Sequence, residues 1–103
     1  MTPRVRFEEE ADAEYRDAGR WYEERRMGLG VDFFNAVDAT LDQIVRLPRA
    51  GAPVPRLSGD LRVRRAPVAR FPYHVIYLEE RATIRVLAIA HDRRRPAYWS
   101  TRL

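Results

Sequence analysis

Residues 61–99, LRVRRAPVARFPYHVIYLEERATIRVLAIAHDRRRPAYW, decide the fold of this chain. Two runs within them, residues 74–78 and 83–90, are rich in β-branched, aromatic and aliphatic side chains, which favour strands. Residues 79–82 separate the runs with a short polar turn. The stretch therefore predicts an antiparallel hairpin of two strands.

A turn centred on Glu80 and Arg81 would set the register of this hairpin. It places one apolar and aromatic set of side chains on one face, because side chains alternate along a strand. That set is Tyr73, Val75, Tyr77, Ile84, Val86 and Ala88. The other face mixes aliphatic side chains with two histidines and an arginine, so it is the first candidate for function. Its members are His74, Ile76, Leu78, Arg85, Leu87, Ile89 and His91.

The rest of the chain predicts strands at its ends and two helices between them. Residues 3–7 alternate as a short edge strand, and residues 61–65 as a further strand. Apolar residues recur at helical spacing in two segments, first Ala11, Tyr15, Ala18 and Tyr22, then Phe34, Val37, Leu41, Ile44 and Val45. Gly28 and Gly30 separate the helices, and Pro48 ends the second. Residues 48–60 hold three prolines and two glycines and predict a loop.

The predicted fold is α+β, in the order strand, helix, helix, three antiparallel strands and a short tail. The two apolar helix stripes and the apolar sheet face can cover one another as two layers. A chain of 103 residues with 46% hydrophobic residues can bury such a core. We therefore expect one domain over residues 1–103.

Charge is distributed unevenly along the chain. All 19 basic residues are arginines. Residues 1–47 hold 7 arginines against 11 acidic residues, a net charge of −4, whereas residues 48–103 hold 12 against 4, a net charge of +8. The basic half predicts an anionic partner, either nucleic acid or an acidic protein segment. A solvated sheet edge kept soluble by arginine explains the same charge.

Several classes of function have little support in the sequence. The chain has no cysteine, and its two histidines are far apart, with no HExxH motif or carboxylate-rich loop. We therefore expect no metal and no cofactor. Residues 1–10 lack the apolar core of a signal peptide, and no apolar run reaches about 18 residues. These features predict a cytoplasmic protein without membrane contacts.

Five stretches together resemble the RelE/ParE superfamily of toxins from bacterial type II toxin–antitoxin systems, once called plasmid stabilisation proteins. They are AGRWY (18–22), LGVDFF (29–34), IVRLPRAG (44–51), FPYHVIY (71–77) and IAHDRRRPAYW (89–99). The last two are more similar to ParE-type members. The resemblance implies a helical hairpin on a twisted antiparallel sheet. It also implies a cognate antitoxin that neutralises the toxin in a hetero-oligomer.

The superfamily has two activities, and the resemblance implies one of them. ParE-like members poison DNA gyrase and are not enzymes, which is the expected function here. RelE-like members cut messenger RNA on the ribosome, which is the alternative. A non-toxic nucleic-acid-binding module is a third possibility.

The nuclease alternative predicts a particular set of residues for RNA cleavage. The resemblance carries over Arg62, Arg64, Tyr98 and one of Arg93 and Arg94, whereas His74 stands where those nucleases have an arginine. His91 is the candidate acid or base, since histidine exchanges protons near neutral pH. It is also a candidate structural cap at the end of its strand, and His74 a polar residue of the sheet face.

Two surfaces are predicted for partners. The target would contact arginines and neighbouring aromatic residues, namely Arg62, Arg64, His91, Arg93, Arg94, Arg95, Tyr98 and Trp99. The antitoxin would contact an aliphatic strip with one arginine, namely Ile76, Leu78, Arg85, Leu87 and Ile89. Helices on the opposite face cannot cover this strip, so either another chain or the C-terminal tail, with Trp99, must hide it.

Overall fold

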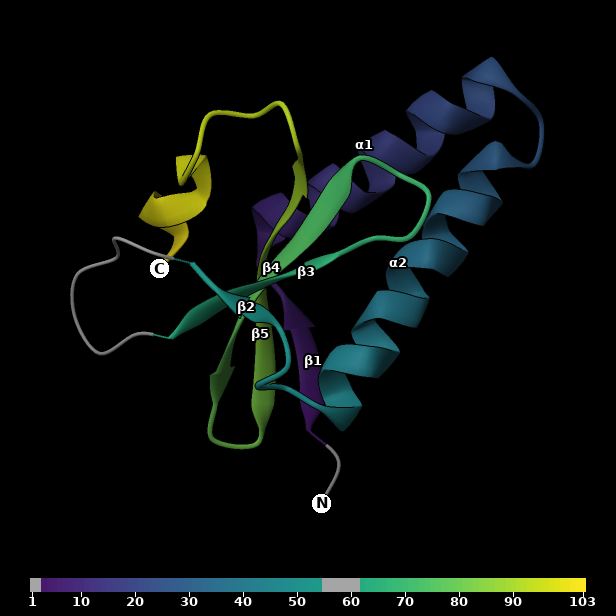
Figure 1. The fold of residues 1–103 in the computed structure, drawn as a ribbon. Helices are drawn as coiled ribbons and strands as arrows, with labels where there is room; N and C mark the ends of the chain where they lie inside the picture. The colour runs from purple at the N-terminus through teal and green to yellow at the C-terminus, as the bar shows by residue number, and fades with distance from the viewer. Residues whose placement is uncertain (1–2, 55–61) are drawn as a thin grey trace.

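The computed structural model describes residues 3–54 and 62–103, whose strands form a five-stranded sheet (Figure 1). The sheet order is β1-β5-β4-β3-β2, with β1 parallel to β5 and all other neighbours antiparallel. The elements are β1 (Arg4–Phe7), α1 (Glu9–Arg25), α2 (Leu29–Arg46), β2 (Ala52–Pro53), β3 (Val63–Pro67), β4 (Tyr73–Glu80), β5 (Thr83–His91) and the 3-10 helix η1 (Tyr98–Arg102).

This arrangement confirms the predicted α+β fold, with two differences among the strands. Strand β2 lies within residues 48–60, which the sequence predicted to be a loop. Strand β3 begins two residues later than predicted, at Val63, and Leu61 lies outside the described residues. Strand β2 is a two-residue edge element that pairs with β3, so its formation depends on the neighbouring strand rather than on its own composition.

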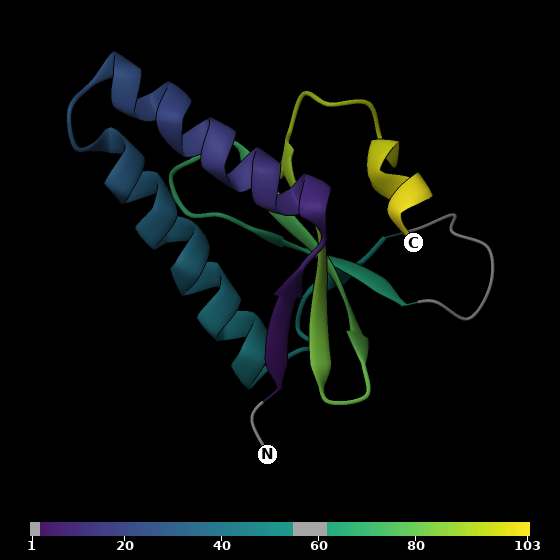
Figure 2. The same ribbon diagram turned by 180° about the vertical axis from the view of Figure 1, so that it is seen from behind.

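Helices α1 and α2 form a hairpin that covers one face of the sheet (Figure 2). Gly28 joins the helices with a φ of 90°, which favours glycine. Glu23 accepts hydrogen bonds at 3.0–3.1 Å from the backbone N–H groups of Gly28 and Gly30. One α1 side chain thus satisfies donors that the start of α2 would otherwise leave unpaired.

The core between the helices and the sheet contains the predicted stripes. Phe33 and Val37 of α2 and Val75 and Tyr77 of β4 are fully buried there. The helices therefore lie on the tyrosine side of the sheet, as predicted. We call this the helix side and the opposite face the front.

Two features change the predicted register. Glu80 pairs with Thr83, so the turn is centred on Arg81 and Ala82, and Tyr77 pairs with Val86 rather than with Ile84. A β-bulge in β5 then leaves Leu87 unpaired, because Ile76 pairs with Ala88. Beyond the bulge each β5 side chain lies on the face opposite to the one predicted. Ile89 belongs to the helix-side core and Ala88 to the front, which corrects two predictions.

The front face has a core of its own, formed with the C-terminal tail. Trp99 of η1 is 3% exposed and packs in a cluster with Val63, Ile76, Leu78 and Leu87. Figure 1 shows η1 on the side of the sheet away from α2. The predicted alternative in which the tail hides the aliphatic strip is therefore confirmed, and the strip is not an open surface in this structure.

Candidate functional site

The sheet separates the arginines that were predicted to act together. Residues that pair across neighbouring strands share a face, and Arg64 pairs with Tyr77, whereas Arg65 pairs with Ile76. Arg64 therefore lies on the helix side and Arg65 on the front. Arg62 has the same parity as Arg64, so the predicted pair does lie together, but not on the mixed face.

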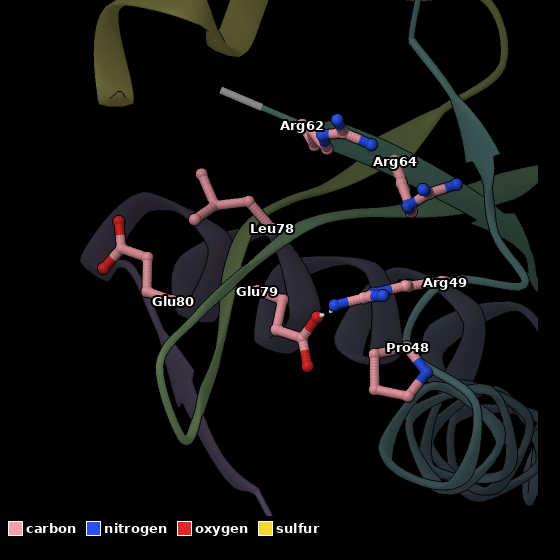
Figure 3. A pocket seen from close by; sticks show the side chains of 7 residues that line it. All are labelled: Pro48, Arg49, Arg62, Arg64, Leu78, Glu79 and Glu80. Carbon is pink, nitrogen blue, oxygen red and sulfur yellow. Dashed lines mark ion pairs between the residues drawn. The ribbon is translucent and has the colours of Figure 1, made fainter. Parts of the chain in front are cut away.

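Arg62 and Arg64 line a basic cleft of about 400 Å³ at one edge of the sheet (Figure 3). Arg64 Nη1 donates to the carbonyl oxygen of Gly51 at 2.8 Å, and Arg49 Nε lies 3.7 Å from a carboxylate oxygen of Glu79. The complete lining is Pro48, Arg49, Arg62, Arg64, Leu78, Glu79 and Glu80. Three guanidinium groups in one concave site can hold a carboxylate or a phosphate.

Tyr77 fixes one wall of this cleft. Its hydroxyl donates to the carbonyl oxygen of Pro48 at 2.7 Å, directly beside Arg49. A Cβ on Gly51 would lie 2.3 Å from that hydroxyl, so only glycine fits there. The segment that follows α2 is thereby held against β4, which positions Arg49 opposite Glu79.

His91 is not part of the cleft. It pairs with Tyr73, four residues along β4 from the partner of Arg64, which is about 13 Å at the rise of a strand. Its ring makes an edge contact with the ring of Tyr73 at 5.0 Å, and its Nδ1 accepts the backbone N–H of Arg93 at 3.0 Å. The structure gives it the contacts of the structural cap and places it on the helix side, not on the mixed face.

Tyr98 and Trp99 are held by contacts within the protein. The Tyr98 hydroxyl donates to Glu14 Oε2 at 2.6 Å, and burial together with this bond raises the pKa of Tyr98 above its usual value. Trp99 is buried in the front core. With the tail in this position, Trp99 offers no surface to a target.

Arg93, Arg94 and Arg95 are exposed on the segment after β5, as predicted. The Arg94 guanidinium lies 4.0 Å from the centre of the Tyr98 ring, a cation–π contact. Arg94 and Arg95 line a pocket on the front, whereas Arg93 does not.

The predicted antitoxin residues lie inside the protein. Ile76, Leu78 and Leu87 are buried under η1, and Ile89 faces the helices. Arg85 is 17% exposed and is paired with Glu8 at 2.5 Å and with Glu80 at 3.3 Å. These contacts raise the pKa of Arg85, with the Glu8 hydrogen bond as the main cause.

Comparison with known proteins assigns the family. Residues 5–96 match the model of the ParE toxin of the type II toxin–antitoxin system parDE. The chain belongs to the ParE toxin family. The sequence resemblance is therefore confirmed, on its ParE side. No curated protein matches the chain in sequence.

The fold of this ParE-family chain also occurs in a solved toxin–antitoxin structure. A chain of the chromosomal ParDE system from P. aeruginosa superimposes with a TM-score of 0.69 and 15% sequence identity, covering 87% of this chain and 96% of that one. At such low identity the match supports the fold alone. Within the described residues of the ParE-family chain, neither helix is long and apolar enough to cross a membrane.

Sequence reasoning missed one constellation in this ParE-family toxin. His74 Nδ1 lies 2.8 Å from Asp92 Oδ1, in the pocket that Arg65, Arg94 and Arg95 also line. The two residues are 18 positions apart, and only the shifted register places His74 opposite Ala90, close to Asp92. The signal in the sequence was a histidine and an aspartate at paired strand ends, which the predicted register did not bring together.

Proposed function

We propose that this ParE-family toxin stops growth by binding DNA gyrase and holding it on cleaved DNA, without bond-breaking chemistry of its own. One observation carries the proposal. The residues that RNA cleavage would need lie in two separate places, since Arg62 and Arg64 line the basic cleft, whereas His91, Arg94 and Tyr98 line a groove beside α1, where Tyr98 is hydrogen-bonded to Glu14. RNA cleavage needs an acid and a base within reach of one phosphate.

The basic cleft is the proposed gyrase contact. Arg62 is exposed, and Arg49, also exposed, has its partner Glu79 at 3.7 Å, a weak surface ion pair. These arginines can turn toward acidic side chains of a partner at small cost. Charge complementarity of this kind speeds association and selects the partner. This target also places the action of the toxin in the cytoplasm.

Neutralisation by a cognate antitoxin is the second part of the proposal. A groove of about 460 Å³ beside α1 is open, and it is lined by Trp21, Tyr22, Tyr73 and the predicted antitoxin residue Ile89. Trp21 is 50% exposed, which is unusual for so large an apolar side chain. We propose that an antitoxin segment covers this groove, while Ile76, Leu78 and Leu87 become accessible only if η1 leaves the front.

A gyrase supercoiling assay tests the proposal. We expect the purified chain to inhibit supercoiling of relaxed plasmid, and the double variant Arg62→Ala/Arg64→Ala to need at least about tenfold more protein, a loss of about 1.4 kcal/mol in binding. The matched control is Arg20→Ala/Arg26→Ala, on α1 and directly after its last residue, which removes the same charge from exposed positions. An equal loss of inhibition in both double variants would show that the cleft is not the gyrase contact. A parent chain that does not inhibit supercoiling would show that gyrase is not the target.

A further inference from the structure

The front pocket with His74 and Asp92 has no role in the proposed gyrase contact. It lies between β3, β4 and the segment after β5, and it measures about 650 Å³. Its floor is apolar, formed by Ile76, Ala90 and the buried Trp99. Its charged lining comes from three separate parts of the chain, so the fold assembles it.

His74 is held in a defined orientation in this pocket. Its Nδ1 bonds to Asp92 Oδ1 at 2.8 Å, and the backbone N–H of Asp92 donates to the carbonyl oxygen of Pro72 at 2.9 Å, which anchors the carboxylate. A carboxylate at Nδ1 leaves Nε2 as the free polar atom of the ring. In the described parts of the chain, no hydrogen bond is made to Nε2. The Asp92 contact therefore orients the imidazole and leaves its Nε2 atom available to a ligand.

The charge around the pocket favours an anionic ligand. Arg65, Arg94 and Arg95 are exposed and line it, and the Arg94 guanidinium makes a cation–π contact with Tyr98. Asp92 is the only acidic residue of the described lining, and it is engaged by His74. Forked guanidinium donors match phosphate oxygens in pairs.

We propose that this pocket binds one nucleotide of a single nucleic-acid strand. The phosphate lies between the Arg65 and Arg95 guanidinium groups and the Nε2 atom of His74, and the sugar and base lie over the apolar floor. The three arginines carry more positive charge than the single Asp92 carboxylate of the pocket can neutralise. A nucleic-acid strand supplies the missing negative charge, because it carries one phosphate at every nucleotide. A concave pocket of this size accepts a single unstacked unit rather than a duplex.

This inference is separate from gyrase binding. The proposed toxin action needs only a protein contact, whereas the pocket gives the toxin its own contact to nucleic acid. Binding to a strand can therefore be present or absent whatever the supercoiling assay gives. The two proposals also use different residues, since the cleft is lined by Arg62 and Arg64 and the pocket by Arg65 and His74.

Fluorescence anisotropy with the full chain tests the inference. The probes are fluorescein-labelled 12-nucleotide single strands of DNA and of RNA, and the competitors are an unlabelled duplex and a poly-glutamate peptide. We expect Arg65→Ala, Arg95→Ala and His74→Ala each to weaken strand binding at least about fivefold. The control is Arg93→Ala, which removes the same charge two residues from Arg95 but outside the pocket, and which should change binding less than about twofold. Arg65→Ala should also lower the slope of log K against log salt by about 0.7.

Three results would overturn the proposed nucleotide pocket. Equal weakening by Arg93→Ala and Arg95→Ala would mean diffuse charge and would overturn the pocket. Tighter binding of poly-glutamate than of either strand, with the same dependence on His74, would make it a peptide site instead. Circular dichroism and thermal melting check each variant, and His74→Gln, which nearly keeps the side-chain volume, replaces His74→Ala if that variant unfolds. Absence of binding to both strands by the parent chain would also refute the proposal.

Discussion

Glu14, in the first half of α1, holds the C-terminal tail in place. Its carboxylate accepts hydrogen bonds from the Tyr98 hydroxyl, from the Arg102 guanidinium at 2.9 and 3.1 Å, and from the Ile89 backbone N–H at 3.1 Å. Arg102 in turn donates to the carbonyl oxygen of Leu87. Glu14 and Arg102 thus form hydrogen bonds with backbone groups of β5 that lie beyond its pairing with β1. Without these bonds a free sheet edge would remain there.

Replacing Glu14 by glutamine should destabilise the protein. Glu14 and Arg102 are only 19% and 12% exposed, and Glu14→Gln leaves the Arg102 charge without a carboxylate partner. We expect the free energy of unfolding to fall by about 2–3 kcal/mol, measured by urea denaturation. Asp17→Asn, which breaks only an exposed ion pair on the same helix, should cost less than about 0.5 kcal/mol. Equal effects of the two variants would contradict the role given to Glu14.

At the scale of elements, the bulge in β5 and the helix η1 belong together. The bulge turns Ala88 to the front beside Leu87, where both belong to the cluster that contains Trp99. The sheet is therefore packed on both faces, by the hairpin on one side and by the five-residue 3-10 helix η1 on the other. This explains why an aliphatic strip that no α-helix reaches is nevertheless buried.

Trp99→Ala should remove most of the front core. A large aromatic side chain deleted from a core costs about 3–5 kcal/mol, a large part of the total stability of a small domain. Thermal or urea unfolding measures the loss. Trp21→Ala is the matched control, because it deletes the same side chain at a position that is 50% exposed, and it should cost about 1 kcal/mol or less. Similar losses in the two variants would mean that η1 does not pack as described.

The helix hairpin depends on two glycines that face each other. A Cβ on Gly30 would lie 2.6 Å from the carbonyl oxygen of Gly19, and a Cβ on Gly19 would overlap the Phe34 ring. The two backbones approach closely at this point, so no side chain fits between them.

Gly30→Ala should therefore push α1 and α2 apart. The contact is with backbone, which cannot move as a side chain can, so we expect a loss of about 1–3 kcal/mol in the free energy of unfolding despite the higher helix propensity of alanine. Val31→Ala, at the next and exposed position, serves as the control and should be nearly neutral. A stabilised Gly30→Ala variant would show that the helices are free to separate.

At the scale of the whole molecule, the part of the chain that contains the helix hairpin is acidic, and the part that contains most of the sheet and the tail is basic. Residues 1–47, with a net charge of −4, form β1 and the helix hairpin, and residues 48–103, with +8, form the rest of the sheet and the tail. Both the basic cleft and the front pocket lie in the second part. An anionic partner is therefore drawn to the sheet and tail rather than to the hairpin.

The five tyrosines make stability sensitive to alkaline pH. Burial together with Asp38 raises the pKa of Tyr15 to about 12, and burial raises the pKa of Tyr22, Tyr73, Tyr77 and Tyr98 above the usual value. Unfolded tyrosines ionise near pH 10, so above that pH the unfolded state binds fewer protons than the folded one. Stability is then fully present below pH 10 and falls as pH rises toward 12.

Absorbance at 295 nm, which reports tyrosinate, measures this directly. We expect little tyrosinate in the native protein at pH 10.5 and near-complete ionisation in denaturant, with urea midpoints falling from pH 10 upward. In Tyr15→Phe the decline should be shallower. Native tyrosines that ionise near pH 10, with a flat stability profile, would contradict the burial described here.

The features that depend on local sequence pattern could be predicted, whereas the register between neighbouring strands could not. Both helix stripes and the tyrosine face follow from spacing alone, and Arg62 and Arg64 do share a cleft. The bulge at Leu87 left no mark in composition, so Ile89 and His91 were assigned to the wrong face. The His74–Asp92 pair depends on that register, which has no local signal, whereas the covering role of Trp99 was one of the two predicted alternatives for the aliphatic strip.

The decisive measurement compares the two superfamily targets with one protein preparation. Purified chain is added in parallel to gyrase with supercoiled plasmid and to ribosomes translating a defined messenger RNA. We predict that linear plasmid accumulates after detergent and protease treatment, while the messenger RNA stays intact. Cleaved messenger RNA with gyrase unaffected, and loss of that cleavage in His91→Ala, would contradict the proposed function and restore the nuclease.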